Sequence, residues 1–516
     1  MLHEPADLAA RTGRVTHLRD RSRQEEGWFM GTRGWALLFV LCGTIFLEGI
    51  DVAMMAVAIP AIRSDLGLAT DTAAWVMSGY VLGYAGFTLL GGRAADLLGR
   101  RRMFLLWLGV FLAFSGLGGL ATEGWMLVVA RFVTGVAAAF MTPAALSLIT
   151  TSYAEGPRRN KALLVFAGTG AAGFSLGLVI GGLLTQLGWR WVFFAPVLLA
   201  AALLVAAVRL VPRQDGPPAR RRGFDLPGVI TAAGAMLLAA YTVVRLEHGL
   251  HDWPLTLVSG LAALVLAGAF VVVERRCPDP LVRLGILRQG PVVRADLGAL
   301  LFLGAFFGFQ FIVTLYLQEL RDWSPLQTAV ALIVMGVDAV LAPTLTPKLV
   351  ARFGNAQVIV GGFVLAVIAY GLFLPVGMDW SYAAMFPTLF LSGLAFALAY
   401  GPLTIAATDG VTGSEQGLAG GLLTTATQFG SAIGIAAVTA GYGLASTGSG
   451  PEATLSAFRV ALIVPVALVV LGALISLVSA REARRAVRRA SQVSSVSASH
   501  TSANPAQRSG GISSWK

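Results

Sequence analysis

The sequence predicts an all-α integral membrane protein with fourteen transmembrane helices, and three observations lead to this fold class. Hydrophobic residues make up 56% of the 516 residues and charged residues only 13%, about half the charged fraction of a soluble domain. The apolar residues form runs long enough to cross a bilayer, for which a helix needs about 20 residues. These runs are rich in Leu, Ala, Val and Gly without period-two alternation, which favours helices over a β-barrel.

Fourteen apolar runs are the predicted membrane spans. Two are weaker than the rest, because 226–245 ends in Arg245 and 326–350 contains Asp338. The predicted spans are residues 34–60, 73–92, 103–121, 125–150, 161–187, 190–211, 226–245, 256–274, 293–318, 326–350, 356–377, 381–407, 416–443 and 458–480.

The distribution of Lys and Arg indicates how the chain is oriented. Basic residues cluster in the N-terminal tail, in every second loop and directly after the last span. Cytoplasmic loops carry an excess of Lys and Arg, so both termini are expected in the cytoplasm, which requires an even number of spans. We therefore expect a multi-pass protein of the cell membrane. The isolated basic residues on the opposite side are Arg63, Arg190, Arg245, Arg321 and Arg459.

The sequence also excludes several classes of function. The net charge of +11 lies in short loops and tails between apolar runs, so it does not indicate nucleic-acid binding. Cys42 lies in an apolar run and Cys277 in a basic loop, and two cysteines make no metal site. The sequence contains no phosphate-binding loop of the GxxxxGK[ST] form and no histidine inside a span. We therefore expect that the protein is not an enzyme and that it binds no metal and no cofactor.

Three acidic residues lie well inside the predicted spans, where a charge costs about 2.5–3.5 kcal/mol on insertion scales. These functional candidates are Glu48, Asp51 and Asp338. Glu48 and Asp51 are three residues apart and share one helical face, so both are candidates for carrying a proton. Arg131 is the expected partner of Asp51, because a lone guanidinium in a membrane helix needs a carboxylate or carbonyls. Two alternatives stay open: an acid near a helix end that reaches water, and a purely structural ion pair.

Motifs at defined positions along the spans identify a family. Residues 92–102 read GRAADLLGRRR after the second span, 50–60 read IDVAMMAVAIP in the first, and 131–135 read RFVTG in the fourth. The fifth span carries four spaced glycines, which are Gly173, Gly177, Gly181 and Gly182. With these motifs the chain resembles the major facilitator superfamily, and most closely its fourteen-helix drug:proton antiporters of the EmrB/QacA type. It departs from the family pattern at Ala53, Ala56, Leu97, Thr134 and Leu178.

The resemblance implies a major facilitator fold for the fourteen spans. Two six-helix bundles are expected at 34–211 and 293–480, with two inserted linker helices at 226–274. Residues 1–33 are expected to form a cytoplasmic tail. Residues 481–516 are basic and Ser-rich and lack apolar periodicity, so we expect a disordered cytoplasmic tail.

The resemblance also implies an activity. It is the proton-coupled efflux of small lipophilic, cationic compounds, such as drugs, dyes or antibiotics, by alternating access. The partners would be a small-molecule substrate, protons and the lipid bilayer, with the proton gradient as energy source and a monomer as the working unit. Two alternatives stay open, which are a dedicated exporter of one endogenous metabolite or antibiotic, and proton-coupled uptake.

The resemblance assigns roles to the motifs. Arg131 is implied to communicate with Asp51, and Asp96 to contact the helix that begins near Gln416 as part of a gate. The glycine motif is implied to control proton leak. As alternatives, the arginines of the gate anchor to anionic lipid and the glycines only allow close helix packing. The residues of the gating motif are Gly92, Arg93, Asp96, Gly99, Arg100 and Arg101.

Aromatic and amide side chains inside the spans are candidates for a substrate cavity, because aromatic faces attract flat apolar cations. Packing against lipid or within the core is the alternative for each aromatic residue, and Trp75 and Tyr316 also suit the membrane interface. The candidates are Trp75, Tyr80, Tyr84, Phe306, Phe307, Gln310, Tyr316 and Gln428.

Overall fold

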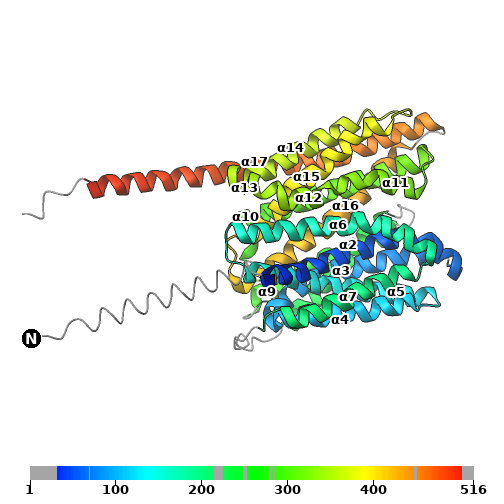
Figure 1. Cartoon of the computed structure of the whole chain (residues 1–516), viewed down its shortest axis with the longest axis horizontal. Coiled ribbons are helices and arrows are strands. Elements are labelled where there is room, and N and C mark those ends of the chain that lie inside the picture. Colours follow the sequence, from blue (N-terminus) through cyan, green and yellow to red (C-terminus); the bar gives the residue numbers. More distant parts are fainter. Residues whose placement is uncertain are drawn as a thin grey trace, which may run out of the picture.

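The computed structural model describes residues 32–68, 70–213, 225–247, 253–277, 280, 282, 285–446 and 450–502. Throughout this part of the chain the regular structure is helical, and long helices lie side by side in one bundle (Figure 1). The all-α prediction is confirmed. The predicted tail at 1–33 lies outside the described residues except for its last two positions.

Six helices form the N-terminal half and two more link it to the C-terminal half. Those of the first half are α2 (Thr32–Leu66), α3 (Thr70–Leu98), α4 (Arg100–Gly119), α5 (Gly124–Ser152), α6 (Pro157–Leu187) and α7 (Trp191–Leu210). The linker helices are α8 (Leu226–Glu247) and α9 (Trp253–Arg276).

The C-terminal half contains more, shorter elements. They are η1 (Ile286–Arg288), α10 (Gly290–Leu315), η2 (Tyr316–Leu320), α11 (Pro325–Leu332), η3 (Ile333–Val337), α12 (Asp338–Thr344), α13 (Thr346–Phe353), α14 (Asn355–Phe373), α15 (Tyr382–Thr408), η4 (Gly413–Glu415), α16 (Gln416–Ala445) and α17 (Pro451–Ser502).

The two halves repeat one packing pattern. In the first half α2 packs on α6 and α7, and α4 packs on α5 and α7. In the second half α10 packs on α16 and α17, and α14 packs on α15 and α17. The halves meet where α3 contacts α16 and where α6 contacts α12 and α15, while α8 and α9 pack together beside α3 and α16. Related halves of this kind are a recurrent design of membrane transporters.

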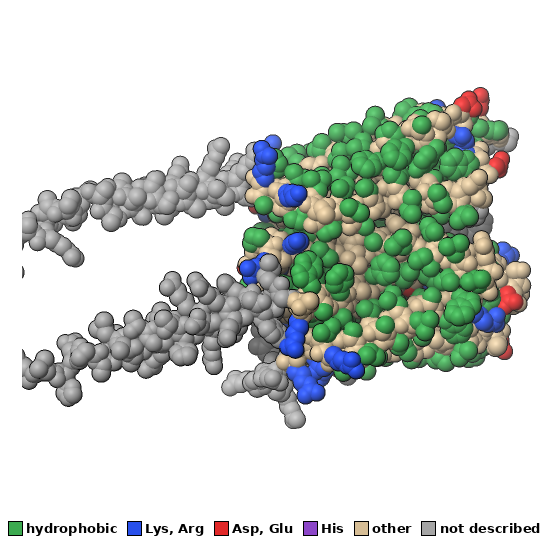
Figure 2. Space-filling view, in the orientation of Figure 1, with side chains coloured by type: hydrophobic (Ala, Val, Ile, Leu, Met, Phe, Trp, Pro, Cys, Tyr) green, Lys and Arg blue, Asp and Glu red, His purple; other side chains and the backbone are tan. Residues whose placement is uncertain are grey.

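The lateral surface is that of a membrane protein. Thirteen helices in the described residues are long and apolar enough to cross a bilayer, and α3 accounts for the remaining predicted span. Figure 2 shows apolar side chains along the flank of the bundle, with charged side chains concentrated at its two ends. Leu264 and Val265 on α9, for example, are each 70% exposed, which water would disfavour and lipid would not.

The structure corrects two predictions. The span expected as one helix at 326–350 is interrupted by a 3-10 turn at Ile333–Val337 and restarts again at Thr346. Pro347, in the first turn of α13, explains the restart at Thr346, because proline has no backbone N–H and its ring clashes with the preceding helical turn. Residues 481–502, expected to be disordered, continue α17 instead, and the Arg and Ala residues of 481–490 are strong helix formers.

Candidate functional site

The most buried ion pair of the described residues joins α2 to α5. Nη1 of Arg131 donates to Oδ2 of Asp51 at 2.5 Å, and each side chain is only 2% exposed. The Tyr80 ring lies over the guanidinium, with its centroid 4.4 Å from Cζ. The pairing predicted from the sequence is therefore present. Removing one partner would leave a buried charge uncompensated, which typically costs about 3–5 kcal/mol.

Glu48 lies one turn from this pair and has its own partner. Its Oε2 atom accepts a hydrogen bond of 2.8 Å from the Thr142 hydroxyl on α5. Thr142 was not among the predicted site residues. It lies eleven residues after Arg131, which is close to three helical turns, so the face that carries Arg131 also carries Thr142. That spacing is the signal by which the sequence could have indicated it.

Asp338 lies in the other half and does not join this cluster. It begins α12 directly after the 3-10 turn, is 2% exposed, and its Oδ2 atom has no hydrogen-bond partner in the described part of the chain. The segment around it packs on α6, where Gly336 lies against Ser175. The structure thus places two buried acidic sites on opposite sides of the contact between the halves.

The predicted gating motif joins α3 to the beginning of α16. Asp96 accepts hydrogen bonds from the backbone N–H groups of Gly417 at 3.1 Å and Leu418 at 3.0 Å. N–H groups in the first turn of a helix have no partner within that helix, and the helix dipole there favours a negative charge such as that of Asp96. Arg100 completes the cluster by pairing with Asp96 at 2.8 Å and donating to the carbonyl of Gly413. The contact expected between Asp96 and this helix is present, and gating itself stays a prediction.

Glycines and arginines of the same motif bring neighbouring segments close. Gly92 lies against the backbone of α16, where a Cβ atom would meet the Gly417 carbonyl. Gly99 has a φ of +99°, a conformation that side chains rarely adopt, between α3 and α4. Arg93 donates to the Pro280 carbonyl at 3.4 Å, and Arg101 donates to the Val208 carbonyl at 2.8 Å.

Arg159 makes a second connection between the halves, which the sequence analysis missed. It lies at the start of α6, is 2% exposed, and donates to the Thr408 carbonyl at the end of α15 at 2.8 Å. Gln416 donates to the same carbonyl at 3.1 Å and to the Val411 carbonyl at 2.9 Å. Basic residues between spans are common, so the sequence does not distinguish Arg159 from Arg158. Only the tertiary structure shows that Arg159 is buried and Arg158 exposed.

Three of the four motif glycines on α6 face the backbone of α2. A Cβ atom on Gly173 would lie 3.0 Å from Cα of Phe46, one on Gly177 would lie 2.8 Å from Cα of Ile50, and one on Gly181 would meet Met54 at 2.7 Å. These positions border the segment of α2 that carries Glu48 and Asp51. Gly182 differs, because its nearest neighbour would be 3.8 Å away.

Replacing Gly177 with valine is expected to destabilise the protein by about 1–3 kcal/mol, because α2 and α6 would have to separate. The thermal midpoint of the purified protein measures this loss. Gly182→Val is the matched control on the same helix, and it should change the midpoint little. Equal losses for the two variants would show that the close approach at Gly177 has no special role.

The aromatic candidates for a substrate cavity occupy separate places. Tyr80 is buried against Arg131, and Tyr84 is buried edge-to-face on Tyr80, with ring centroids 5.9 Å apart. Trp75 is 39% exposed and stacks on Tyr241 of the linker helix α8 at 6.0 Å. Of the eight candidates, the structure therefore shows Tyr80 in contact with the buried ion pair, and Tyr84 packed behind it.

The remaining candidates lie in the C-terminal half. Phe306 and Phe307 meet edge-to-face at 5.6 Å, and Phe307 also contacts Phe174 of α6 across the two halves at 5.7 Å. Tyr316 is buried, with its hydroxyl donating to the Gly377 carbonyl at 2.6 Å. Gln310 and Gln428 are half-buried. The cavity role of all eight candidates stays a prediction.

Comparisons with known proteins point to one family. The profile of the Major Facilitator Superfamily matches residues 41–435. The puromycin resistance protein pur8 of Streptomyces alboniger is 34% identical over 82% of this chain and 85% of its own length. The lincomycin resistance protein of Streptomyces lincolnensis is 36% identical over 78% of this chain and 83% of its own length.

Two further comparisons agree. The cephamycin export protein CmcT of Amycolatopsis lactamdurans is 34% identical over 80% of this chain and 86% of its own length. Among solved structures, the human organic anion transporter MFSD10 has a TM-score of 0.58 at 17% identity, covering 84% of this chain and 97% of that one. At that identity the structural likeness concerns the fold alone.

Proposed function

This chain belongs to the Major Facilitator Superfamily, and from that premise we propose that it exports antibiotics or similar small lipophilic compounds in exchange for protons. It is a multi-pass membrane transporter and not an enzyme. The subfamily we propose is that of the fourteen-helix drug:proton antiporters of the EmrB/QacA type. The observation that carries the export proposal is the set of relatives named for antibiotic resistance or export.

The buried cluster on α2 and α5 supports the proton-coupled part of the proposal. Asp51 faces Arg131 at 2.5 Å, and both are almost completely removed from solvent. Protonation would neutralise Asp51 and weaken its attraction to Arg131, so the position of α2 relative to α5 would depend on the proton. Glu48, one turn away on Thr142, is the second candidate for proton carriage.

The connections between the halves support alternating access. Asp96 and Arg100 hold the beginning of α16, and Arg159 holds the end of α15. We propose that both termini are cytoplasmic, which places these connections at the cytoplasmic side. This conformation would then be closed toward the cytoplasm, and breaking the connections would open it. A monomer contains both halves and is the proposed working unit.

Uptake into inverted membrane vesicles tests this function. Radiolabelled puromycin and lincomycin should accumulate when the lumen is acidified, because each proton that leaves would drive substrate inward. A protonophore should abolish the accumulation. Accumulation that persists with the protonophore would contradict proton coupling, and uptake by right-side-out vesicles under an inward proton gradient would favour symport instead.

Export of one endogenous antibiotic is the second candidate, since the relatives are named for single compounds. The same vesicles separate the two functions. A broad exporter should accumulate several unrelated compounds and show mutual competition, whereas a dedicated exporter should accumulate one compound and resist competition by the rest.

A further inference from the structure

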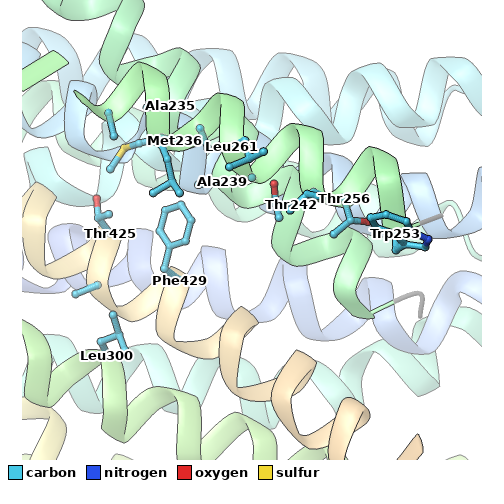
Figure 3. A pocket seen from close by; sticks show the side chains of 16 residues that line it. Ala235, Met236, Ala239, Thr242, Trp253, Thr256, Leu261, Leu300, Thr425 and Phe429 are labelled. Carbon is cyan, nitrogen blue, oxygen red and sulfur yellow. The ribbon is translucent and has the colours of Figure 1, made fainter. Parts of the chain in front are cut away.

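An apolar groove opens on the flank of the bundle between the linker helices and the C-terminal half (Figure 3). Its volume is about 860 Å³, and α8, α9 and α16 line it together with Leu300 of α10. Along α9 the lining extends from Trp253 to Ala267, which is about 21 Å at 1.5 Å per residue. This exceeds one leaflet of the roughly 30 Å hydrocarbon core, so the groove suits an elongated apolar molecule.

An unpaired polar atom lies toward the end of this groove that is far from Trp253, and a second unpaired polar atom lies on the neighbouring helix α10. The Thr425 side chain lines the groove, and its buried Oγ1 atom has no hydrogen-bond partner among the described residues. Oδ1 of Asp296, on α10 one turn before the lining residue Leu300, is also buried without a hydrogen-bond partner in the described part of the chain. Buried polar atoms in proteins are nearly always paired, so two such atoms on helices that pack on each other indicate a missing partner.

The helix register places Asp296 beside this end of the groove. Val292, Asp296 and Leu300 are spaced by four residues and therefore share one face of α10. Val292 packs in one apolar cluster with Leu418 of α16, and Leu300 contacts the backbone at Gly430. Asp296 thus faces α16 at a level between these two contacts, which is also the level of the unpaired threonine hydroxyl.

We propose that the groove binds an amphiphilic organic cation. Its apolar body lies between α9 and α16, along the ring of Phe429, and its charged nitrogen lies against the Asp296 carboxylate and the Thr425 hydroxyl. A carboxylate at the edge of an apolar surface selects a cation over an anion of the same shape. The inference rests on the proposed export function and deepens it, because it assigns the substrate a site that is open to the lipid and separate from Asp51.

Binding of a lipophilic cation to the full-length protein in lipid nanodiscs tests the site. The probe is radiolabelled tetraphenylphosphonium, with empty nanodiscs as background, and tetraphenylborate is an anion of the same shape. Asp296→Asn should weaken tetraphenylphosphonium binding at least tenfold and should not weaken tetraphenylborate binding. Asp322→Asn is the matched control, since that exposed aspartate lies outside the groove and its φ of +52° suits asparagine.

A second variant tests the groove without changing a charge. Ala426→Trp places a bulky side chain among the lining residues and should also weaken tetraphenylphosphonium binding at least tenfold. Unchanged binding in either the Asp296 or the Ala426 variant overturns the proposal. Puromycin and lincomycin uptake by the wild-type vesicles decides the export function separately. If the wild-type protein exports substrate but both variants bind tetraphenylphosphonium as the wild type does, the groove site is refuted and the export function is not.

Discussion

Asp51→Asn is expected to abolish proton-driven accumulation in inverted vesicles, while the protein, although destabilised by the uncompensated charge of Arg131, still binds substrate. Asparagine keeps the shape of aspartate and can still accept a hydrogen bond from Arg131, but it carries no proton in exchange. Transport coupled to the gradient should fall at least tenfold, which corresponds to about 1.4 kcal/mol or more. Counterflow, in which labelled and unlabelled substrate exchange without a gradient, should continue.

Asp65→Asn is the matched control for this change. Asp65 lies near the end of the same helix and pairs with Arg190 at 3.1 Å, but the two side chains are 50% and 42% exposed. Exposed pairs contribute about 0–1 kcal/mol, so this variant should transport normally. Wild-type accumulation by the Asp51 variant would refute its assignment to proton coupling. Loss of counterflow together with accumulation would instead indicate that the pair with Arg131 serves substrate binding or folding.

Gly92→Val is expected to prevent the contact between α3 and α16 and to shift the protein toward a state open at that end. A valine side chain would overlap the Gly417 carbonyl and lie against Gly421, and backbone cannot move aside as a flexible side chain can. Asp96 would then lose its bonds to the first turn of α16, each worth about 1.5–3 kcal/mol to a charged acceptor. Export should fall severely.

Spin labels at Arg102 and Thr412 measure this opening, because both positions are exposed and lie beside the contact. The two native cysteines, Cys42 and Cys277, are replaced first. The distance between the labels should increase in the Gly92 variant. Gly109→Val on α4 is the control, since a Cβ atom there would meet nothing within 4 Å. An unchanged distance in the Gly92 variant would contradict a gate at this contact.

Much of the fold could be predicted because the membrane limits the possibilities. A spanning segment must be apolar over its whole length and must pair its own backbone, so composition and length together determine the number and type of elements. The pair of Asp51 and Arg131 was also predictable, because a charged side chain inside a membrane span is costly unless it pairs with an opposite charge. The restart of the helix at Thr346 was missed, although Pro347 is visible in the sequence. The 3-10 turn at Ile333–Val337 contains no proline that could have indicated it.

The sequence by itself determined the all-helical membrane class and the buried pair of Asp51 and Arg131, since each depends on the local cost of placing a group in lipid. Only the tertiary structure decided which helices meet. It distinguished the buried Arg159 from the exposed Arg158 and left a buried oxygen of Asp296 without a partner one turn from a residue of α10 that lines the groove. The physical reason is that apolar helices present similar surfaces in every direction, so the pairing of helices depends on close backbone approaches and buried polar contacts between distant residues.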